Sequence, residues 1–351
     1  MMQKQTIYIK VDAQNPDPQL IAQVAEIIRR GGTVAFPTET VYGLGANALD
    51  DRAVSGIFQA KGRPADNPLI VHIAEPAMVE ELAADVTAPA RRAMEVFWPG
   101  PLTVVLPKQP VVPEVVTGGL ATVAIRMPDH PVALALIRAA GLPVAAPSAN
   151  VSGRPSPTTA AHVLEDLEGR IDAIIDAGPC RVGVESTVLD LSAEPPTVLR
   201  PGGVTREDLE SVLGHVAETS GGSENGEKPR SPGTKYTHYA PYAQMVVINI
   251  PDLAVMRQRV AKMAELLQWE EQRVGILATD ETASLYEADE IISLGGREDL
   301  TAVSRNIYGA LRHMDQKDVD VIICEGFPVH GMGAAVMNRL TKAAGGNMIT
   351  D

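Results

Sequence analysis

Residues 36–48 read FPTETVYGLGANA, and this stretch decides how the first half of the chain is interpreted. The apolar run Thr33–Phe36 that leads into it predicts a strand. Two hydroxyl-bearing residues, Thr38 and Thr40, follow at the end of that strand, and two glycines further on would let the backbone approach another group closely. The glycine spacing and the Lys-Ser/Thr pair of a P-loop are missing. The stretch therefore predicts a hydroxyl-lined loop at a strand end.

On both sides of this stretch, short β-prone runs are separated by segments with helical spacing of apolar residues, which indicates an α/β fold. The further predicted strands of the first half are Ile7–Val11, Leu69–Ile73, Thr103–Leu106, Thr122–Arg126, Val144–Ala146, Ile174–Asp176, Thr187–Leu191 and Thr197–Leu199. The predicted helices are Pro18–Arg30, Arg52–Ala60, Pro89–Phe97, Pro131–Ala140, Thr159–Leu167 and Arg206–Leu213.

The second half has a cleaner alternation, which predicts a small parallel or mostly parallel sheet. The predicted strands are Met245–Ile250, Arg273–Leu277, Glu290–Leu294 and Val319–Cys324, and the predicted helices are Leu253–Trp269, Leu300–Met314 and Met332–Ala344. The two halves are joined by a polar, Gly/Ser-rich stretch that is typical of a flexible linker. We therefore expect one domain at 1–213, a linker at 214–243 that contains the tyrosine-rich segment 231–241, and a second domain at 244–351.

Composition narrows the possible functions. Hydrophobic residues make up 45% and charged residues 21%, as in a globular protein, and the formal net charge is -14. Aromatic residues are only 4%, which argues against stacked platforms for single-stranded nucleic acid. Cys180 and Cys324 have no metal-binding spacing, and the sequence shows neither a signal peptide nor a membrane-length apolar run. These features predict a reduced, cytoplasmic protein.

Cationic residues follow predicted elements at two places. Lys61 and Arg63 lie where a helix ends and a Gly-Arg-Pro turn begins, so they could offset the helix dipole or hold a triphosphate. The spacing alone favours neither role. Arg126 ends an apolar strand before a proline turn, which is a suitable position to bind a carboxylate.

Short polar side chains follow two further strands. Ser148, Asn150 and Ser156 come after the strand at Val144, where α/β folds tend to bind ligands, although a Ser/Asn turn is the alternative. Ser186 and Arg200 could lie on adjacent strands. His72 by itself is typical of an ordinary core or surface histidine.

Taken in order, PTETVYGLG, Lys-Gly-Arg, Ser-Ala-Asn, STV and LRPG resemble the YrdC-type nucleotide-binding domain. The later SPGTKYTHYAP and the α/β tail resemble the two-domain members of that family, the L-threonylcarbamoyl-AMP synthases. The resemblance implies an α/β protein with a YrdC-like twisted mixed-sheet N-terminal domain and a smaller Rossmann-like C-terminal domain.

The resemblance also implies site residues. Its catalytic and phosphate-contacting positions correspond to Lys61, Arg63, Ser148 and Asn150. Its ATP-binding positions correspond to Arg63, Asn67, Thr122, Ser148, Ser156, Arg200 and Tyr236, the last of which would close over the nucleotide. Its threonine-binding positions correspond to Thr38, Thr40, His72, Arg126, Ala146 and Ser186. Mg²⁺ would accompany ATP without protein ligands.

The implied reaction joins L-threonine, bicarbonate or CO2, and ATP to give threonylcarbamoyl-AMP and pyrophosphate, the first step of a tRNA modification. A downstream tRNA-modifying complex would take the adenylate, and no membrane is involved. One alternative is a carbamoyl-phosphate-dependent carbamoyl-adenylate synthase, although the acylphosphatase-like and zinc-binding parts expected there are missing. A second alternative is a non-catalytic RNA-binding module. The acidic balance of both halves weighs against strong RNA binding.

Overall fold

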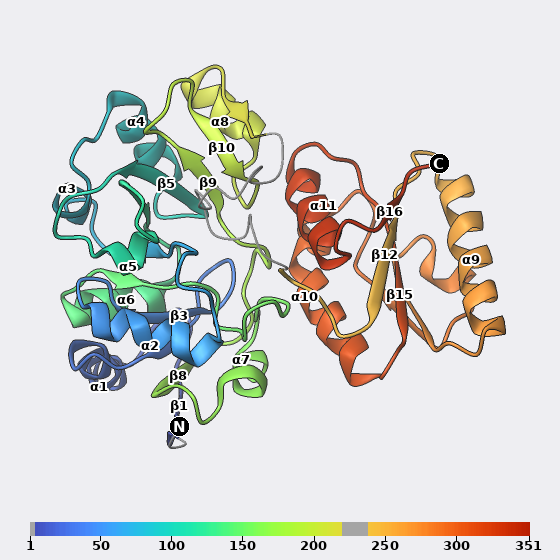
Figure 1. The fold of residues 1–351 in the computed structure, drawn as a ribbon, viewed down its shortest axis with the longest axis horizontal. Coiled ribbons are helices and arrows are strands. Elements are labelled where there is room, and N and C mark those ends of the chain that lie inside the picture. Colours follow the sequence, from blue (N-terminus) through green and yellow to red (C-terminus); the bar gives the residue numbers. More distant parts are fainter. Residues whose placement is uncertain (1–3, 220–237) are drawn as a thin grey trace. The chain divides into compact units, whose positions relative to one another are not determined.

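The computed structural model describes residues 4–219 and 238–351, which fall into two compact units (Figure 1). The first unit contains most of the described residues up to 219. The second contains 238–351 together with two short segments of the first half, Gly153–Pro155 and Val182–Val184. The first unit also includes a short strand at Ala217–Glu218.

The described part of the first unit is built on an 11-stranded mixed sheet with the order β1-β8-β2-β3-β7-β4-β6-β5-β9-β10-β11. The strands are β1 Ile7–Lys10, β2 Val34–Phe36, β3 Gly43–Asn47, β4 Ile70–His72, β5 Leu102–Pro107, β6 Thr122–Arg126, β7 Val144–Ala145, β8 Ala173–Asp176, β9 Thr187–Asp190, β10 Thr197–Arg200 and β11 Ala217–Glu218. The helices are α1 Pro18–Arg29, α2 Asp51–Lys61, α3 Met78–Leu82, α4 Ala88–Phe97, α5 Glu114–Thr117, α6 Pro131–Ala140, α7 Ala160–Leu167 and α8 Arg206–Leu213.

Alternation along the strands places two cores on opposite faces of this sheet. Val34 and Phe36 of β2 pack with apolar residues of α1 and α6, whereas Ala35 between them packs with residues of α2, α4 and α7. Both cores are made largely of Val, Ile, Leu and Ala, as the low aromatic content predicts.

The N-terminal end of α2 is fixed by the Asp50 carboxylate, which accepts hydrogen bonds from the backbone of Arg52 and Ala53. Its C-terminal end is fixed by Gly62, whose φ of 61° is a left-handed conformation that favours glycine. Lys61 is therefore the last residue of a helix whose two ends are both fixed. The position of the Lys61 backbone, from which the side chain extends, is fixed as well.

Gly43 and Gly45 follow the Thr38–Thr40 loop, and the sequence predicted no strand there. Both lie in β3, which pairs antiparallel with β2 and with β7. A Cβ atom at Gly45 would lie 2.6 Å from Val144 Cγ1 and 2.7 Å from Phe36 Cε1. The glycine is thus required by close packing within the sheet, not by the approach of a ligand.

The described part of the second unit contains a five-stranded, wholly parallel sheet with the order β14-β13-β15-β12-β16, which confirms the predicted parallel α/β arrangement. The strands are β12 Gln244–Ile248, β13 Val274–Ala278, β14 Glu290–Ser293, β15 Val321–Glu325 and β16 Met348–Ile349. The helices are α9 Leu253–Trp269, α10 Leu300–Gln316 and α11 Met332–Ala343, with a 3-10 turn at Ala283–Leu285. Helix α9 lies on one side of this sheet, and α10 and α11 lie on the other (Figure 1).

Cys180 and Cys324 are buried and unpaired. Among the described residues, no helix is long and apolar enough to cross a membrane.

Candidate functional site

The site is built on one face of the first unit's sheet. Strands β4 and β6 are parallel, and His72 lies directly beside Arg126. Strands β6 and β5 are antiparallel, with Val104 beside Ile125, so the next pair along the ladder is Thr103 and Arg126. Residues opposite one another in a ladder project from the same face. Register therefore places His72, Arg126 and Thr103 in one row across three strands.

A small apolar cluster continues this face beneath the row. Ile70, Val105 and Ala124 lie two residues from His72, Thr103 and Arg126, and they pack with apolar residues of β9 and β10. This cluster is separate from the two main cores. It forms an apolar floor next to the polar row.

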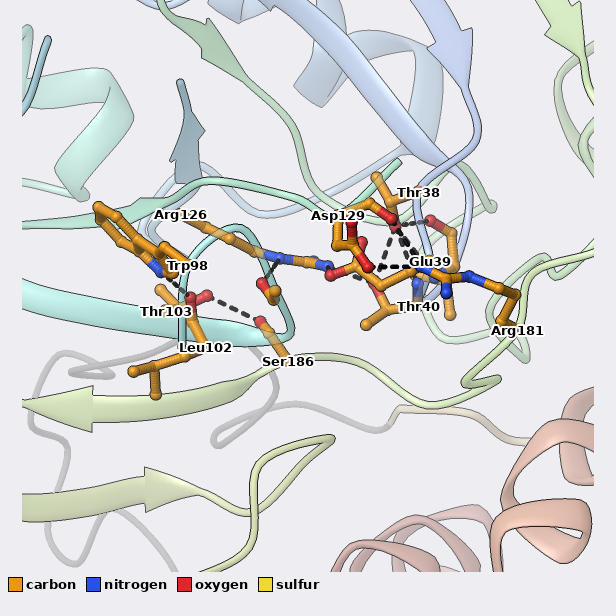
Figure 2. Close-up of polar contacts among 12 residues, drawn as sticks. Thr38, Glu39, Thr40, Trp98, Leu102, Thr103, Arg126, Asp129, Arg181 and Ser186 are labelled. Atoms are coloured by element: carbon orange, nitrogen blue, oxygen red, sulfur yellow. Dashed lines mark hydrogen bonds and ion pairs between the residues drawn. The ribbon is translucent and has the colours of Figure 1, made fainter. Parts of the chain in front are cut away.

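Arg126 is the centre of the polar row, with only 4% of its side chain exposed. Its Nη1 donates to Thr40 Oγ1 at 3.0 Å, and its Nε donates to the Gly100 carbonyl at 3.3 Å. Its Nη2 lies 2.7 Å from Glu39 Oε1 in an ion pair. Figure 2 shows the Arg126 side chain extended toward the Thr38–Thr40 loop, with Thr103 and Ser186 nearby.

The Thr38–Thr40 loop holds its hydroxyls through local hydrogen bonds. Thr38 Oγ1 donates to the Val41 carbonyl at 2.7 Å and lies 2.9 Å from Thr40 Oγ1. Both threonine side chains are buried. The sequence thus correctly predicted a hydroxyl-lined loop, and the structure brings it to Arg126.

His72 is 4% exposed, and its ring packs edge-on to Phe36. Burial, and then the positive charge of Arg126, lower the pKa of His72 to about 3. The imidazole is therefore neutral at physiological pH. It adds a polar but uncharged group to the row.

Ser186 joins the row to the adjacent strand. Its hydroxyl lies 2.7 Å from Thr103 Oγ1, and Arg200 donates from Nη2 to the Ser186 carbonyl at 2.9 Å. The preceding residue, Glu185, accepts a hydrogen bond from Ser156 at 2.5 Å. Ser156, Ser186 and Arg200 are thus brought to one place, and the prediction that Ser186 and Arg200 would be neighbours is confirmed.

Lys61, Ser148 and Asn150 form a second group. Lys61 is 1% exposed, and its Nζ donates to the carbonyl oxygens of Ser148 and Asn150 at 2.5 Å each. The Ser148 hydroxyl donates to Asn150 Oδ1, also at 2.5 Å. Ser148 also forms a backbone bridge with Gly43 of β3. The lysine therefore holds the Ser-Ala-Asn turn in place beside the start of β3.

Arg63, Asn67 and Thr122 lie at the other end of the two parallel strands. Arg63 Nη2 donates to the Pro68 carbonyl at 3.0 Å, and Asn67 is buried just before β4. Thr122 begins β6, four residues before Arg126, which corresponds to about 13 Å of extended strand. In the described parts of the chain, no side-chain hydrogen bond joins Thr122 to another predicted site residue.

Two predicted positions remain. Ala146 directly follows β7 and donates its backbone N–H to the Ile70 carbonyl at 2.9 Å, so it borders the row next to His72. Tyr236 lies outside the described residues.

Sequence reasoning missed Glu39, Gly100 and Thr103 as members of the site. Glu39 stands inside the quoted PTET run, so its place between two site threonines was an available signal. Thr103 was recognised only as part of a strand. Its contact with Ser186 depends on sheet register, which no local pattern gives.

Comparisons with known proteins show the family of the chain. A family model named Sua5_yciO_yrdC and described as "Telomere recombination" matches residues 26–202. A second model, "Threonylcarbamoyl-AMP synthase, C-terminal domain", matches residues 204–345. The chain is 53% identical to the threonylcarbamoyl-AMP synthase of Bacillus subtilis over 334 residues, which cover 95% of each protein.

The similarity extends to an archaeal protein of known structure. The chain is 51% identical to the threonylcarbamoyl-AMP synthase of Pyrococcus abyssi, over 93% of this chain and 94% of the relative. The crystal structure of P. abyssi Sua5 complexed with L-threonine superposes with a TM-score of 0.93 at 48% identity, over 99% of this chain and 100% of that one. Both the sequence matches and the fold extend over the two units, so the chain belongs to the family of two-domain, Sua5-type threonylcarbamoyl-AMP synthases.

Proposed function

We propose that this enzyme converts L-threonine, bicarbonate or CO2, and ATP into L-threonylcarbamoyl-AMP and pyrophosphate, the first step of threonylcarbamoyladenosine formation in tRNA. The observation that carries the proposal is the buried row of His72, Arg126 and Thr103, in which Arg126 contacts Thr40 and Thr103 joins Arg200 through Ser186. The arginine proposed for the carboxylate and the arginine proposed for the phosphates are thereby connected. The threonine-bound structure of the P. abyssi relative supports this assignment.

Threonine would bind at the row. Arg126 would hold its carboxylate, because a guanidinium presents paired donors that match a carboxylate. The hydroxyls of Thr38, Thr40 and Ser186, together with the neutral ring of His72, offer hydrogen bonds to the substrate's polar groups. Ala146 would border the amino acid through its backbone.

ATP would bind along Lys61, Arg63, Asn67, Thr122, Ser148, Asn150, Ser156 and Arg200. Asn67 supports this, since its Oδ1 is buried without a hydrogen-bond partner in the described residues and could accept a donor from the nucleotide. Lys61 would act largely through the Ser148–Asn150 turn that it fixes. Among the described residues, no cluster of three His, Cys, Asp or Glu side chains could hold a metal ion. Mg²⁺ would therefore enter on the phosphates of ATP, retaining water ligands.

The chemistry needs positioning and charge stabilisation more than a protein nucleophile. The neutral amine of threonine attacks the carbon of CO2 and gives up one proton, which leaves a carbamate; from bicarbonate the same step also breaks a C–O bond, and the hydroxide leaves as water with that proton. A carbamate oxygen then forms a bond to the α-phosphorus of ATP. Pyrophosphate leaves as its bond to that phosphorus breaks. Burial, and then the charge of Glu39, raise the pKa of the Cys180 thiol, which makes it a poor nucleophile.

We further propose that segment 231–241 acts as a lid, with Tyr236 closing over the nucleotide, and that residues 214–243 link the two domains. The lid would protect a labile mixed anhydride from water. The product would pass to a downstream tRNA-modifying complex in the cytoplasm. Tyr236→Ala tests the lid: we expect a raised KM for ATP and a shorter lifetime of the adenylate.

The test of the function is pyrophosphate release by the full chain with ATP, Mg²⁺ and bicarbonate, with and without L-threonine. We expect release only when threonine is present, with a product of the mass of threonylcarbamoyl-AMP. Release driven instead by carbamoyl phosphate would assign the other adenylate chemistry. ATP-independent, salt-sensitive RNA binding without pyrophosphate release would assign a binding module.

A further inference from the structure

Glu39 is a buried charge whose bonding is incomplete. The residue is 1% exposed, and the ion pair with Arg126 Nη2 is 2.7 Å long. Within the described residues, neither oxygen of the carboxylate accepts a hydrogen bond, and Arg126 Nη2 donates none. The ion pair is therefore close in distance but lacks hydrogen-bonding geometry.

Incomplete bonding of this kind is costly in a protein interior. A carboxylate offers about four lone-pair positions, and a buried ion pair is stabilising only when further hydrogen bonds satisfy them. A structural pair would normally use the two-donor fork of arginine on both carboxylate oxygens. Here Arg126 instead directs Nη1 to Thr40 and Nε to Gly100. The Glu39 carboxylate therefore still lacks hydrogen-bond donors, and Arg126 Nη2 still lacks a hydrogen-bond acceptor.

The charges of the site indicate which kind of ligand supplies both the missing donors and the missing acceptor. Arg126 and Glu39 together are neutral, and His72 adds no charge because its pKa is lowered to about 3. A ligand with a carboxylate alone would leave one uncompensated negative charge in this buried place, which is unfavourable. An α-amino acid zwitterion brings one charge of each sign, so the site stays neutral.

We infer that Glu39 binds the α-ammonium group of the amino acid while Arg126 binds its carboxylate. The inference rests on the proposed function, to which it adds a specificity-determining residue. Glu39 thus makes the site selective for an amino acid over a hydroxy acid of the same shape. A charge-assisted hydrogen bond of this kind typically strengthens binding by roughly 10–150-fold in affinity.

The experiment is a substrate-by-mutation cycle on the full chain, measured by calorimetry. The ligands are L-threonine and 3-hydroxybutanoate of matching configuration, which lacks the amino group; the proteins are wild type and Glu39→Gln. We expect wild type to prefer threonine by at least about tenfold, and Glu39→Gln to lose most of that preference because only threonine binding weakens. Equal weakening of both ligands would show that Glu39 acts only by holding Arg126, and would overturn the inference.

Asp190→Asn is the matched control, because Asp190 is another buried carboxylate of the same unit and it accepts hydrogen bonds from Ser192. It should leave the ratio of the two affinities unchanged. If Glu39→Gln does not fold, wild type alone decides, since equal binding of the two ligands would refute an ammonium contact. Failure of the proposed function is recognised separately, because wild type would then release no pyrophosphate in response to threonine.

Discussion

Arg200 Nη2 lies 2.9 Å from the carbonyl oxygen of Ser186 and 3.3 Å from its hydroxyl, and Arg200 Nε lies 3.2 Å from the same carbonyl. A residue proposed for ATP and a residue proposed for threonine are thus in direct contact. Both are buried, so the contact is shielded from water. The position of Ser186, proposed to bind threonine, consequently depends on the position of Arg200, proposed to bind ATP.

Arg200→Lys should raise the KM for both substrates, by roughly tenfold each. Lysine keeps the charge but cannot place two donors on one carbonyl, so the Ser186 hydroxyl would also lose its orientation. Steady-state kinetics with each substrate varied in turn would measure this. Arg206→Lys, at an exposed arginine that pairs with Glu210, is the control and should change neither KM. A change confined to ATP would show that the two substrates bind independently.

Lys61→Met should lower the rate of threonine-dependent pyrophosphate release by about 10²–10³-fold. Methionine has similar length but cannot donate to the carbonyls of Ser148 and Asn150, so the turn that carries both side chains loses its anchor. Rates should be measured on protein whose circular dichroism matches wild type. Lys10→Met, at an exposed lysine on β1, should retain full activity. Near-normal turnover by folded Lys61→Met would remove Lys61 from the catalytic group.

Much of the fold could be predicted from local signals. Strand β6 and helix α9 begin and end where the sequence predicts, because an apolar run and a helical spacing led by Asp252 leave little ambiguity. Thr205 and Asp208 form a capping box at the start of α8, which is another local signal of this kind. The short elements α3, α5, β11 and β16 were not predicted, because so few residues carry no clear periodicity.

The site was less accessible to sequence reasoning than the fold. The hydroxyls of the PTET run were predicted, and Ser186 and Arg200 were predicted to be able to lie on adjacent strands, but Glu39 was not predicted to belong to the site. The partner of Glu39 is Arg126, far away in the sequence, and only the loop that follows β2 brings them together. The assignment of individual residues to ATP or to threonine stays a prediction.

Gly45→Ala should destabilise the first unit by about 1–3 kcal/mol. The added methyl group would lie only 2.6 Å from Val144 Cγ1 and 2.7 Å from Phe36 Cε1, so the core must shift to receive it. Urea unfolding would give the change in free energy. Gly56→Ala in α2 is the matched control: its nearest contact is Thr33 Cγ2 at 3.4 Å, and alanine should stabilise the helix by about 0.5–1 kcal/mol. If Gly45→Ala unfolds with the same free energy as wild type, β3 packs less tightly against Val144 and Phe36 than these distances indicate.

His72 should make stability depend on pH in a defined window. Its folded pKa of about 3 is below the ordinary value of 6.5, so between these values the unfolded chain binds a proton that the folded chain does not. The free energy of unfolding should therefore fall as pH falls below 6.5, by about 1.4 kcal/mol per pH unit, or roughly 2 kcal/mol by pH 5. Above pH 6.5 this contribution is constant. His72→Asn, which cannot titrate, should lack that part of the slope in urea unfolding measured from pH 7.5 to 5 without ligands. Parallel curves for the two proteins would mean that the buried imidazole accepts a proton in the folded state, and that Arg126 and burial do not keep it neutral.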